Sequence, residues 1–120
     1  MGPYERFEAW RFSHELVLAV YRLTATWPAH EQFGLTSQVR RAAASIPSNI
    51  AEGSAKRGPA EFRRFLGYSI GSMSELTYLL SLSMELGYTG RREFQAVESL
   101  RERAGRATWR LYQAMSHPSP

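Results

Sequence analysis

The sequence predicts an all-α protein, an antiparallel up-down four-helix bundle built as one domain. No segment alternates apolar and polar residues as an amphipathic strand does. Apolar residues instead recur at three- and four-residue steps in four long segments, which prolines and glycines separate by short connections. The chain has 120 residues, enough for a single modest core. We expect residues 1–115 to form the domain and residues 116–120, with two prolines, to form a flexible tail.

The first predicted helix runs from about Glu8 to Trp27, and Pro28 ends it. Its predicted apolar face contains Phe7, Trp10, Leu16, Val17, Val20, Tyr21, Leu23 and Trp27.

The second predicted helix begins near Thr36 as its N-cap and ends at Gly53 as its C-cap. Because Pro47 has no backbone donor and lies within this segment, we expect it to bend or split the helix. The predicted apolar face contains Val39, Ala43, Ile46 and Ile50.

The third predicted helix has Pro59 in its first turn and ends before Gly87, and the fourth runs from about Gly90 to Met115. The apolar face of the third helix contains Phe62, Leu66, Ile70, Met73, Leu76, Leu80 and Met84. That of the fourth contains Phe94, Val97, Leu100, Ala104, Leu111 and Met115.

The composition excludes several classes of site. The chain has no cysteine, which excludes disulfides, thiolate catalysis and cysteine-ligated zinc, and it has no aspartate. Its three histidines lack the Glu-x-x-His spacing of a di-iron bundle and the spacing of a zinc protease. We therefore expect no metal, no cofactor and no enzymatic activity. No apolar stretch is long enough to cross a bilayer, so we expect a cytoplasmic protein with no membrane partner.

The basic residues suggest a nucleic-acid partner. Fourteen of the 15 cationic residues are arginine, whose planar fork suits phosphate, although a compositional bias would give the same excess. The net charge of +4 permits nucleic-acid binding without requiring it. The candidate phosphate contacts are Arg40, Arg41, Lys56, Arg57, Arg63, Arg64, Arg92, Arg103, Arg106 and Arg110. The alternative is a set of solvated faces with Glu98–Arg101 and Glu102–Arg106 pairs.

A polar stripe accompanies the apolar face of the second helix. Arg41, Ser45, Asn49 and Glu52 are spaced four, four and three residues apart and so share one face, which Gln38 extends. Two interpretations stand equally here: an ordinary solvated face, or a hydrogen-bonded network at a helix or subunit interface.

Apolar side chains away from the predicted stripes favour a homo-oligomer, because one small bundle cannot bury all of them. Partial burial under long arginine side chains is the alternative. These side chains are Phe12, Leu18, Tyr68, Tyr78, Leu82, Trp109 and Tyr112.

Residues 31–53, EQFGLTSQVRRAAASIPSNIAEG, closely resemble the centre of the "four helix bundle protein" family, which includes proteins encoded in intervening sequences of bacterial 23S rRNA genes. Shorter matches flank this run up to about Arg110, and the one departure is Ser69, where the family usually has alanine. The shared positions are Gln38, Arg40, Arg41, Ser45, Pro47, Asn49, Glu52, Gly53, Gly71, Ser72 and Glu75.

The resemblance implies a homopentamer with a central channel and no known enzymatic activity. It also implies a distant relation to the accessory variability proteins of diversity-generating retroelements, which partner a reverse transcriptase and bind nucleic acid. The shared positions then become an expected interface network, in which Asn49 and Ser45 satisfy backbone groups freed by Pro47, and Arg41 pairs with Glu52 or Glu75.

The sequence thus favours an oligomeric, non-enzymatic protein that binds structured RNA or other nucleic acid through arginine-rich surfaces. The alternative is a scaffold for another protein, such as an accessory subunit of a retroelement reverse transcriptase.

Overall fold

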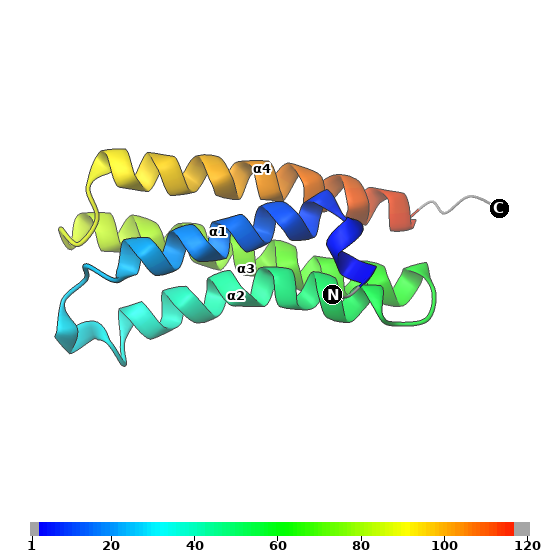
Figure 1. Cartoon of the computed structure of the whole chain (residues 1–120), viewed down its shortest axis with the longest axis horizontal. Helices are drawn as coiled ribbons and strands as arrows, with labels where there is room; N and C mark the ends of the chain where they lie inside the picture. The colour runs from blue at the N-terminus through cyan, green and yellow to red at the C-terminus, as the bar shows by residue number, and fades with distance from the viewer. Residues whose placement is uncertain (1–2, 117–120) are drawn as a thin grey trace.

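The computed structural model describes residues 3–116 and confirms the all-α bundle (Figure 1). Successive helices run in opposite directions, and each packs most closely against two neighbours, while the diagonal pairs lie farther apart across the core. The bundle is elongated, with extents of 51 × 23 × 22 Å. The elements are 3₁₀ turns at Pro3–Arg6 and Ala29–Glu31 and the helices α1 (Glu8–Thr24), α2 (Leu35–Ser54), α3 (Pro59–Glu85) and α4 (Arg91–Ser116).

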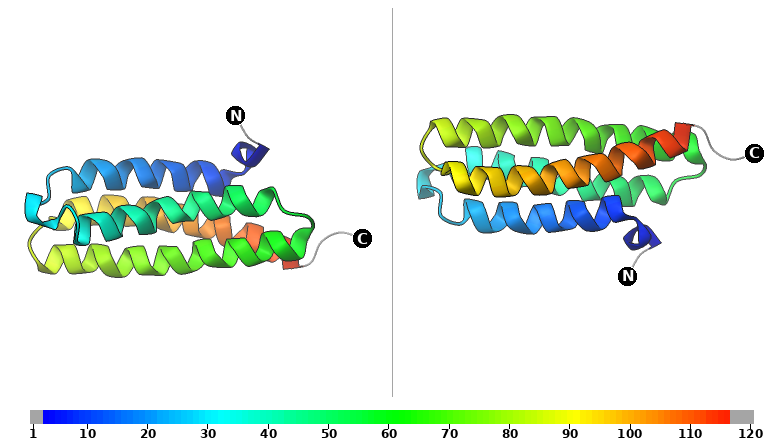
Figure 2. Two further views of the ribbon diagram at one scale, coloured as in Figure 1. Left: turned by 90° about the horizontal axis from the view of Figure 1, so that it is seen from below. Right: turned by 90° about the horizontal axis from the view of Figure 1, so that it is seen from above.

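The up-down topology places the connections at two ends (Figure 2). One end, called here the N-terminal end, holds the first 3₁₀ turn, the connection 55–58 and the last turn of α4. The opposite end holds the α1–α2 and α3–α4 connections. Ser116, which the sequence assigned to the tail, belongs to α4, and residues 117–120 of the predicted tail lie outside the described residues.

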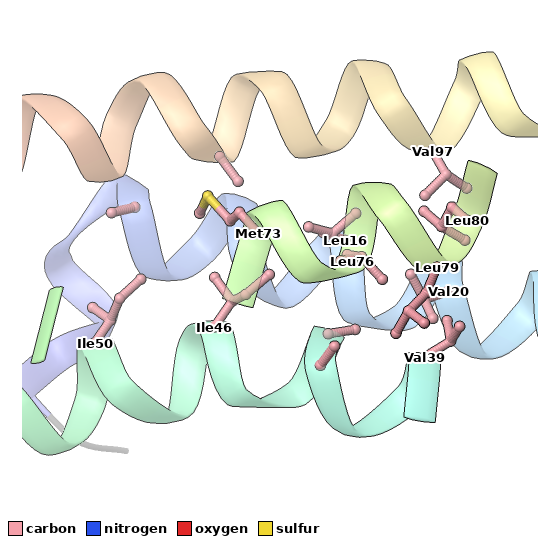
Figure 3. Close-up of a cluster of buried hydrophobic side chains, with 14 of the residues drawn as sticks. Leu16, Val20, Val39, Ile46, Ile50, Met73, Leu76, Leu79, Leu80 and Val97 are labelled. Atoms are coloured by element: carbon pink, nitrogen blue, oxygen red, sulfur yellow. The ribbon is translucent and has the colours of Figure 1, made fainter. Parts of the chain in front are cut away.

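The core runs along the bundle axis (Figure 3). The predicted face of α2 is confirmed. On α4, Val97 and Ala104 are buried, and the other predicted residues pack half-buried against the core. Ile70 and Met84 of α3 are likewise only half-buried, and Ser69 and Ser83 take buried positions on that helix. Leu16, Val20, Val39, Ile46, Ile50, Leu66, Leu76 and Leu80 are the largest fully buried apolar side chains.

The prediction for α1 was partly wrong. Its fully buried face contains the small or hydroxyl-bearing residues Ala9, Ser13 and Thr24 beside its apolar ones, whereas Tyr21 is 43 % exposed. Ser13 Oγ donates to the carbonyl of Ala9 at 2.6 Å, and Thr24 Oγ1 donates to that of Val20 at 2.9 Å. Because these bonds satisfy the hydroxyls within the helix, polar residues can face the core.

Two helix boundaries also differ from the prediction. Helix α1 ends at Thr24, short of Pro28. Helix α2 begins at Leu35, so Thr36 lies in its first turn and is not the N-cap. The cap is supplied by Glu31, whose Oε1 accepts a hydrogen bond from the Leu35 N–H at 3.0 Å. Its Oε2 accepts one from the Tyr88 hydroxyl at 2.9 Å, which links the two connections at this end of the bundle.

Helix α2 continues through Pro47, so of the two expected outcomes, a bend or a split, the split does not occur. Pro47 is buried, and beside it the Ser69 hydroxyl of α3 donates to the Ile46 carbonyl at 2.8 Å. Gly53 lies inside the last turn of α2 and is not its C-cap, which is Ala55. A Cβ at Gly53 would stand 2.7 Å from the Cβ of Phe65, so glycine is needed for the close approach of α2 and α3.

Gly87 ends α3 as predicted. Its φ of +81° suits glycine, the Tyr88 N–H donates to the Ser83 carbonyl at 2.9 Å, and the Gly87 N–H donates to that of Met84 at 3.1 Å. These two hydrogen bonds close the end of the helix around a residue in the left-handed conformation.

We expect Gly53→Ala to lower the free energy of unfolding by about 1–3 kcal/mol, because the added methyl group forces α2 and α3 apart. Gly71→Ala is the matched control, since its Cβ would meet nothing within 4 Å and it should stabilise the exposed middle of α3 by about 0.5–1 kcal/mol. Urea unfolding followed by circular dichroism measures both. Equal effects of the two changes would contradict the close helix contact.

The Glu31 cap predicts a pH dependence. The Leu35 N–H and the Tyr88 hydroxyl lower the pKa of Glu31 below its ordinary value of 4.5. The contribution of the ionised carboxylate to stability is therefore complete above about pH 4.5 and is lost as the pH falls through the lowered pKa. Thermal unfolding should show the largest Tm difference between wild type and Glu31→Gln at neutral pH, with convergence in acid. A difference independent of pH would show that the charge of Glu31 contributes nothing.

Candidate nucleic-acid and subunit interfaces

A groove between α2 and α3 gathers five of the ten positions predicted for an interface. It has a volume of about 490 Å³. At its floor Ser45 Oγ lies 2.5 Å from Ser72 Oγ, which joins the two helices by a hydrogen bond. This polar groove is lined by Gln38, Arg41, Ala42, Ser45, Ser72 and Glu75.

Side-chain hydrogen bonds reinforce α2 on both sides of Pro47, but with partners that differ from the prediction. Asn49 Nδ2 donates to the Ser45 carbonyl at 2.8 Å, and Ser45 Oγ donates to the Ala42 carbonyl at 2.9 Å. The carbonyl that lacks its helical donor because of Pro47 is that of Ala43, four residues earlier. Neither side chain bonds to it, so both add second bonds to carbonyls elsewhere on the helix.

The expected ion pair of Arg41 with Glu52 or Glu75 does not form among the described residues. Arg41 Nη2 instead donates to Ser37 Oγ at 3.4 Å. Arg41 and Glu75 line the same groove, both exposed, so a cation and a carboxylate remain available there to an outside partner.

The other predicted interface positions do not line this groove. Pro47 and Gly53 are both buried, Gly53 against Phe62 and Phe65 of α3, and so serve the fold. Glu52 is exposed on the last turn of α2, and Gly71 is exposed on α3.

Four of the candidate phosphate contacts are engaged within the protein, and two of these connect helices through neutral partners. Arg40 Nε donates to Thr24 Oγ1 at 2.8 Å, and its guanidinium lies 4.5 Å from the centroid of the Tyr21 ring. Arg63 of α3 donates to Ser116 Oγ of α4, and its guanidinium lies 4.2 Å from the Tyr112 ring centroid.

The other two engaged arginines pair with carboxylates. Arg64 contacts both oxygens of Glu61, at 3.0 and 3.1 Å. This hydrogen-bonded guanidinium lowers the pKa of the Glu61 carboxyl, and the pairing raises the pKa of Arg64. Arg103 pairs with Glu15 of α1 and packs over the Phe12 ring at 4.2 Å.

Five candidates keep an exposed charge without an ion pair or hydrogen bond to any described residue: Lys56, Arg57, Arg92, Arg106 and Arg110. Of these, Lys56 lies over a ring, with its Nζ 5.3 Å from the centroid of Phe65.

These five cations do not form one patch. Lys56 and Arg57 lie in the connection at the N-terminal end, while Arg106 and Arg110 lie one turn apart on α4. Arg92 stands about 21 Å along α4 from Arg106, at 1.5 Å per residue.

Of the two ion pairs expected on α4, only one forms among the described residues. Glu98–Arg101 forms, with an N–O distance of 2.8 Å, whereas Glu102–Arg106 does not form within the described chain. The α4 surface therefore keeps a basic character at Arg106 and Arg110.

Exposed apolar side chains are partly those expected. Phe12, Leu82 and Tyr112 pack against the core, whereas Leu18, Tyr68, Tyr78 and Trp109 are exposed. Sequence reasoning missed Phe33, which is 92 % exposed in the α1–α2 connection. Its position outside any periodic segment was the only signal in the sequence.

Neither a metal centre nor a membrane span emerges from residues 3–116. No three His or Glu side chains there are grouped so as to hold a metal ion. None of the helices described combines the length and the apolar character needed to cross a bilayer.

The profile of the 23S rRNA-intervening sequence protein family matches residues 5–109. The chain belongs to this family. A solved structure is similar to this 23S rRNA-intervening sequence protein, with a TM-score of 0.81 and 19 % sequence identity over 88 % of this chain and 95 % of the other. It is a protein with unknown function from the S23 ribosomal protein family of Bacteroides thetaiotaomicron VPI-5482, and the likeness concerns the fold alone. The search of curated proteins gave no match.

The family match covers the polar groove and most of the free cations of this 23S rRNA-intervening sequence protein. Lys56, Arg57, Arg92 and Arg106 lie within it, whereas Arg110 follows directly after its end. The resemblance seen in residues 31–53 corresponds to α2 and the connection before it.

Proposed function

We propose that this protein is a non-enzymatic homo-oligomer of the cytoplasm, a homopentamer, that binds structured RNA by charge. The observation that carries the proposal is the division among its basic residues. Arginines that stabilise the bundle have partners within it, whereas the exposed Arg57, Arg106 and Arg110 have no carboxylate partner among the described residues. Free cations of this kind neutralise phosphates and release counterions on binding.

The mode of binding follows from the helical surface that carries these cations. Guanidinium groups hold phosphate oxygens in a fork, and phosphate contacts position a nucleic acid without reading its sequence. One copy offers few free cations, so its affinity at physiological salt should be weak. Joining five copies multiplies these contacts, because the later ones form within an already bound complex.

The subunit interface proposed here is the polar groove between α2 and α3. Arg41 and Glu75 line it with their charges unpaired, so they can form pairs with a neighbouring copy. The groove holds a single carboxylate and no histidine, which offers no acid–base pair for a reaction and supports the non-enzymatic assignment.

Assembly is tested by filling the groove. We expect Ser72→Leu to block the groove and convert the oligomer to smaller species, measured by light scattering coupled to size exclusion, while circular dichroism stays helical. Ser74→Leu is the matched control, because Ser74 lies two residues away on α3 and lines a different groove. An unchanged mass for Ser72→Leu would reject this surface as the interface, and a wild-type monomer would reject the oligomer itself.

RNA binding is tested by fluorescence anisotropy with a labelled structured RNA at several salt concentrations. We expect wild-type affinity to fall steeply with salt, and the double variant Arg106→Gln/Arg110→Gln to bind more weakly and to reduce the salt slope by about 2 for each copy that contacts the RNA. The control Arg22→Gln/Arg91→Gln removes the same charge from exposed arginines outside the candidate set.

Equal weakening by both double variants would indicate that only net charge matters. An intact oligomer that binds no RNA would reject the RNA proposal. It would then favour the alternative of a protein-interaction scaffold, for which the exposed ring of Phe33 is the structural observation.

A further inference from the structure

A second groove, between α3 and α4, is distinct from the polar groove. It has a volume of about 380 Å³, within the range of small-ligand sites. The indole of Trp109, half exposed, forms part of its wall. This Trp109 groove is lined by Ile70, Met73, Ser74, Arg101, Glu102, Gly105, Arg106 and Trp109.

The indole is held in place by the residues behind it. The Trp109 and Tyr112 rings are stacked, with centroids 5.3 Å apart and planes inclined by 16°. The guanidinium of Arg63 in turn lies 4.2 Å from the Tyr112 centroid, and the Tyr112 ring lies beside Gly67 of α3. Trp109 therefore presents a supported aromatic surface whose orientation requires little ordering on binding.

Charges are arranged unevenly around this surface. Arg101 is tied to Glu98, whereas Arg106 has no partner within the described chain. Glu102 also lines the groove. Its carboxylate would repel a phosphate but can accept hydrogen bonds from the amino groups of a base. A ligand with an aromatic ring system bearing hydrogen-bond donors and an attached anion matches these three features.

We propose that the Trp109 groove binds one unpaired nucleobase of the RNA, stacked on the indole, with the adjoining phosphate on Arg106. This inference rests on the proposed RNA binding and specifies which part of the RNA is recognised. Bases within a duplex are already stacked and paired, so only a loop, bulge or end supplies one. A docked helix fits less well, because the core of a protein interface is depleted of charge and this groove carries three charged side chains.

The test compares two RNAs of equal length and charge in the anisotropy assay, one a hairpin with an unpaired loop and the other fully paired. Wild type should prefer the loop RNA. Trp109→Leu should weaken loop binding by roughly 10- to 100-fold, the effect of losing one stacked base, and leave duplex binding unchanged. Tyr78→Leu is the matched control, because Tyr78 is a 65 % exposed aromatic residue elsewhere on α3.

Two further measurements separate stacking from a structural effect. Saturating loop RNA should quench tryptophan emission in wild type but much less in Trp109→Phe. Ser74→Leu, which fills the groove from the α3 side, should reproduce the loss of loop preference with the indole intact.

Each other outcome is decisive. Equal loss of loop and duplex binding, or no loss in Trp109→Leu, overturns the stacking site while RNA binding stands. Dissociation of the oligomer by Trp109→Leu without a change in loop preference would assign the groove to a subunit contact and overturn the proposal. Wild-type protein that binds neither RNA rejects the proposed function itself.

Discussion

The close contact between α2 and α3 is the constraint on which the rest of this bundle depends. Gly53 allows the helices to meet where a methyl group would collide with Phe65, and Ser69 joins them at the Ile46 carbonyl beside Pro47. This contact fixes the register of the two helices, which in turn places Ser45 opposite Ser72. The polar groove thus depends on the close approach of the α2 and α3 backbones. Its polar residues lie together because this contact holds the two helices in one register.

Helix α3 separates two surfaces of different chemistry. On its α2 side lies the polar groove, where Arg41 and Glu75 remain unpaired, and on its α4 side lies the Trp109 groove with a supported indole. The two grooves occupy different sides of one helix, so the proposed subunit contact at the polar groove does not itself cover the Trp109 groove of the same copy.

Arginine serves two purposes in this protein. Arg63 and Arg103 fasten α4 to α3 and α1 through hydrogen bonds and ring contacts, using the length and planarity of the side chain. The exposed arginines without partners leave their charge available to the phosphates of the proposed RNA. The excess of arginine over lysine thus has a structural component besides any role in RNA recognition, which is why net charge alone indicated a partner so weakly.

The sequence by itself determined the helices, their order, the stop at Gly87 and most of the core, because these follow from local periodicity and from the conformations open to glycine and proline. It also placed Gln38, Arg41 and Ser45 on one face of α2. Only the tertiary structure decided that Gly53 is a packing residue, that Glu31 caps α2 and that Arg41 lacks its expected carboxylate partner. Each depends on distances between helices, which a one-dimensional pattern does not contain, and the same holds for which arginines are free.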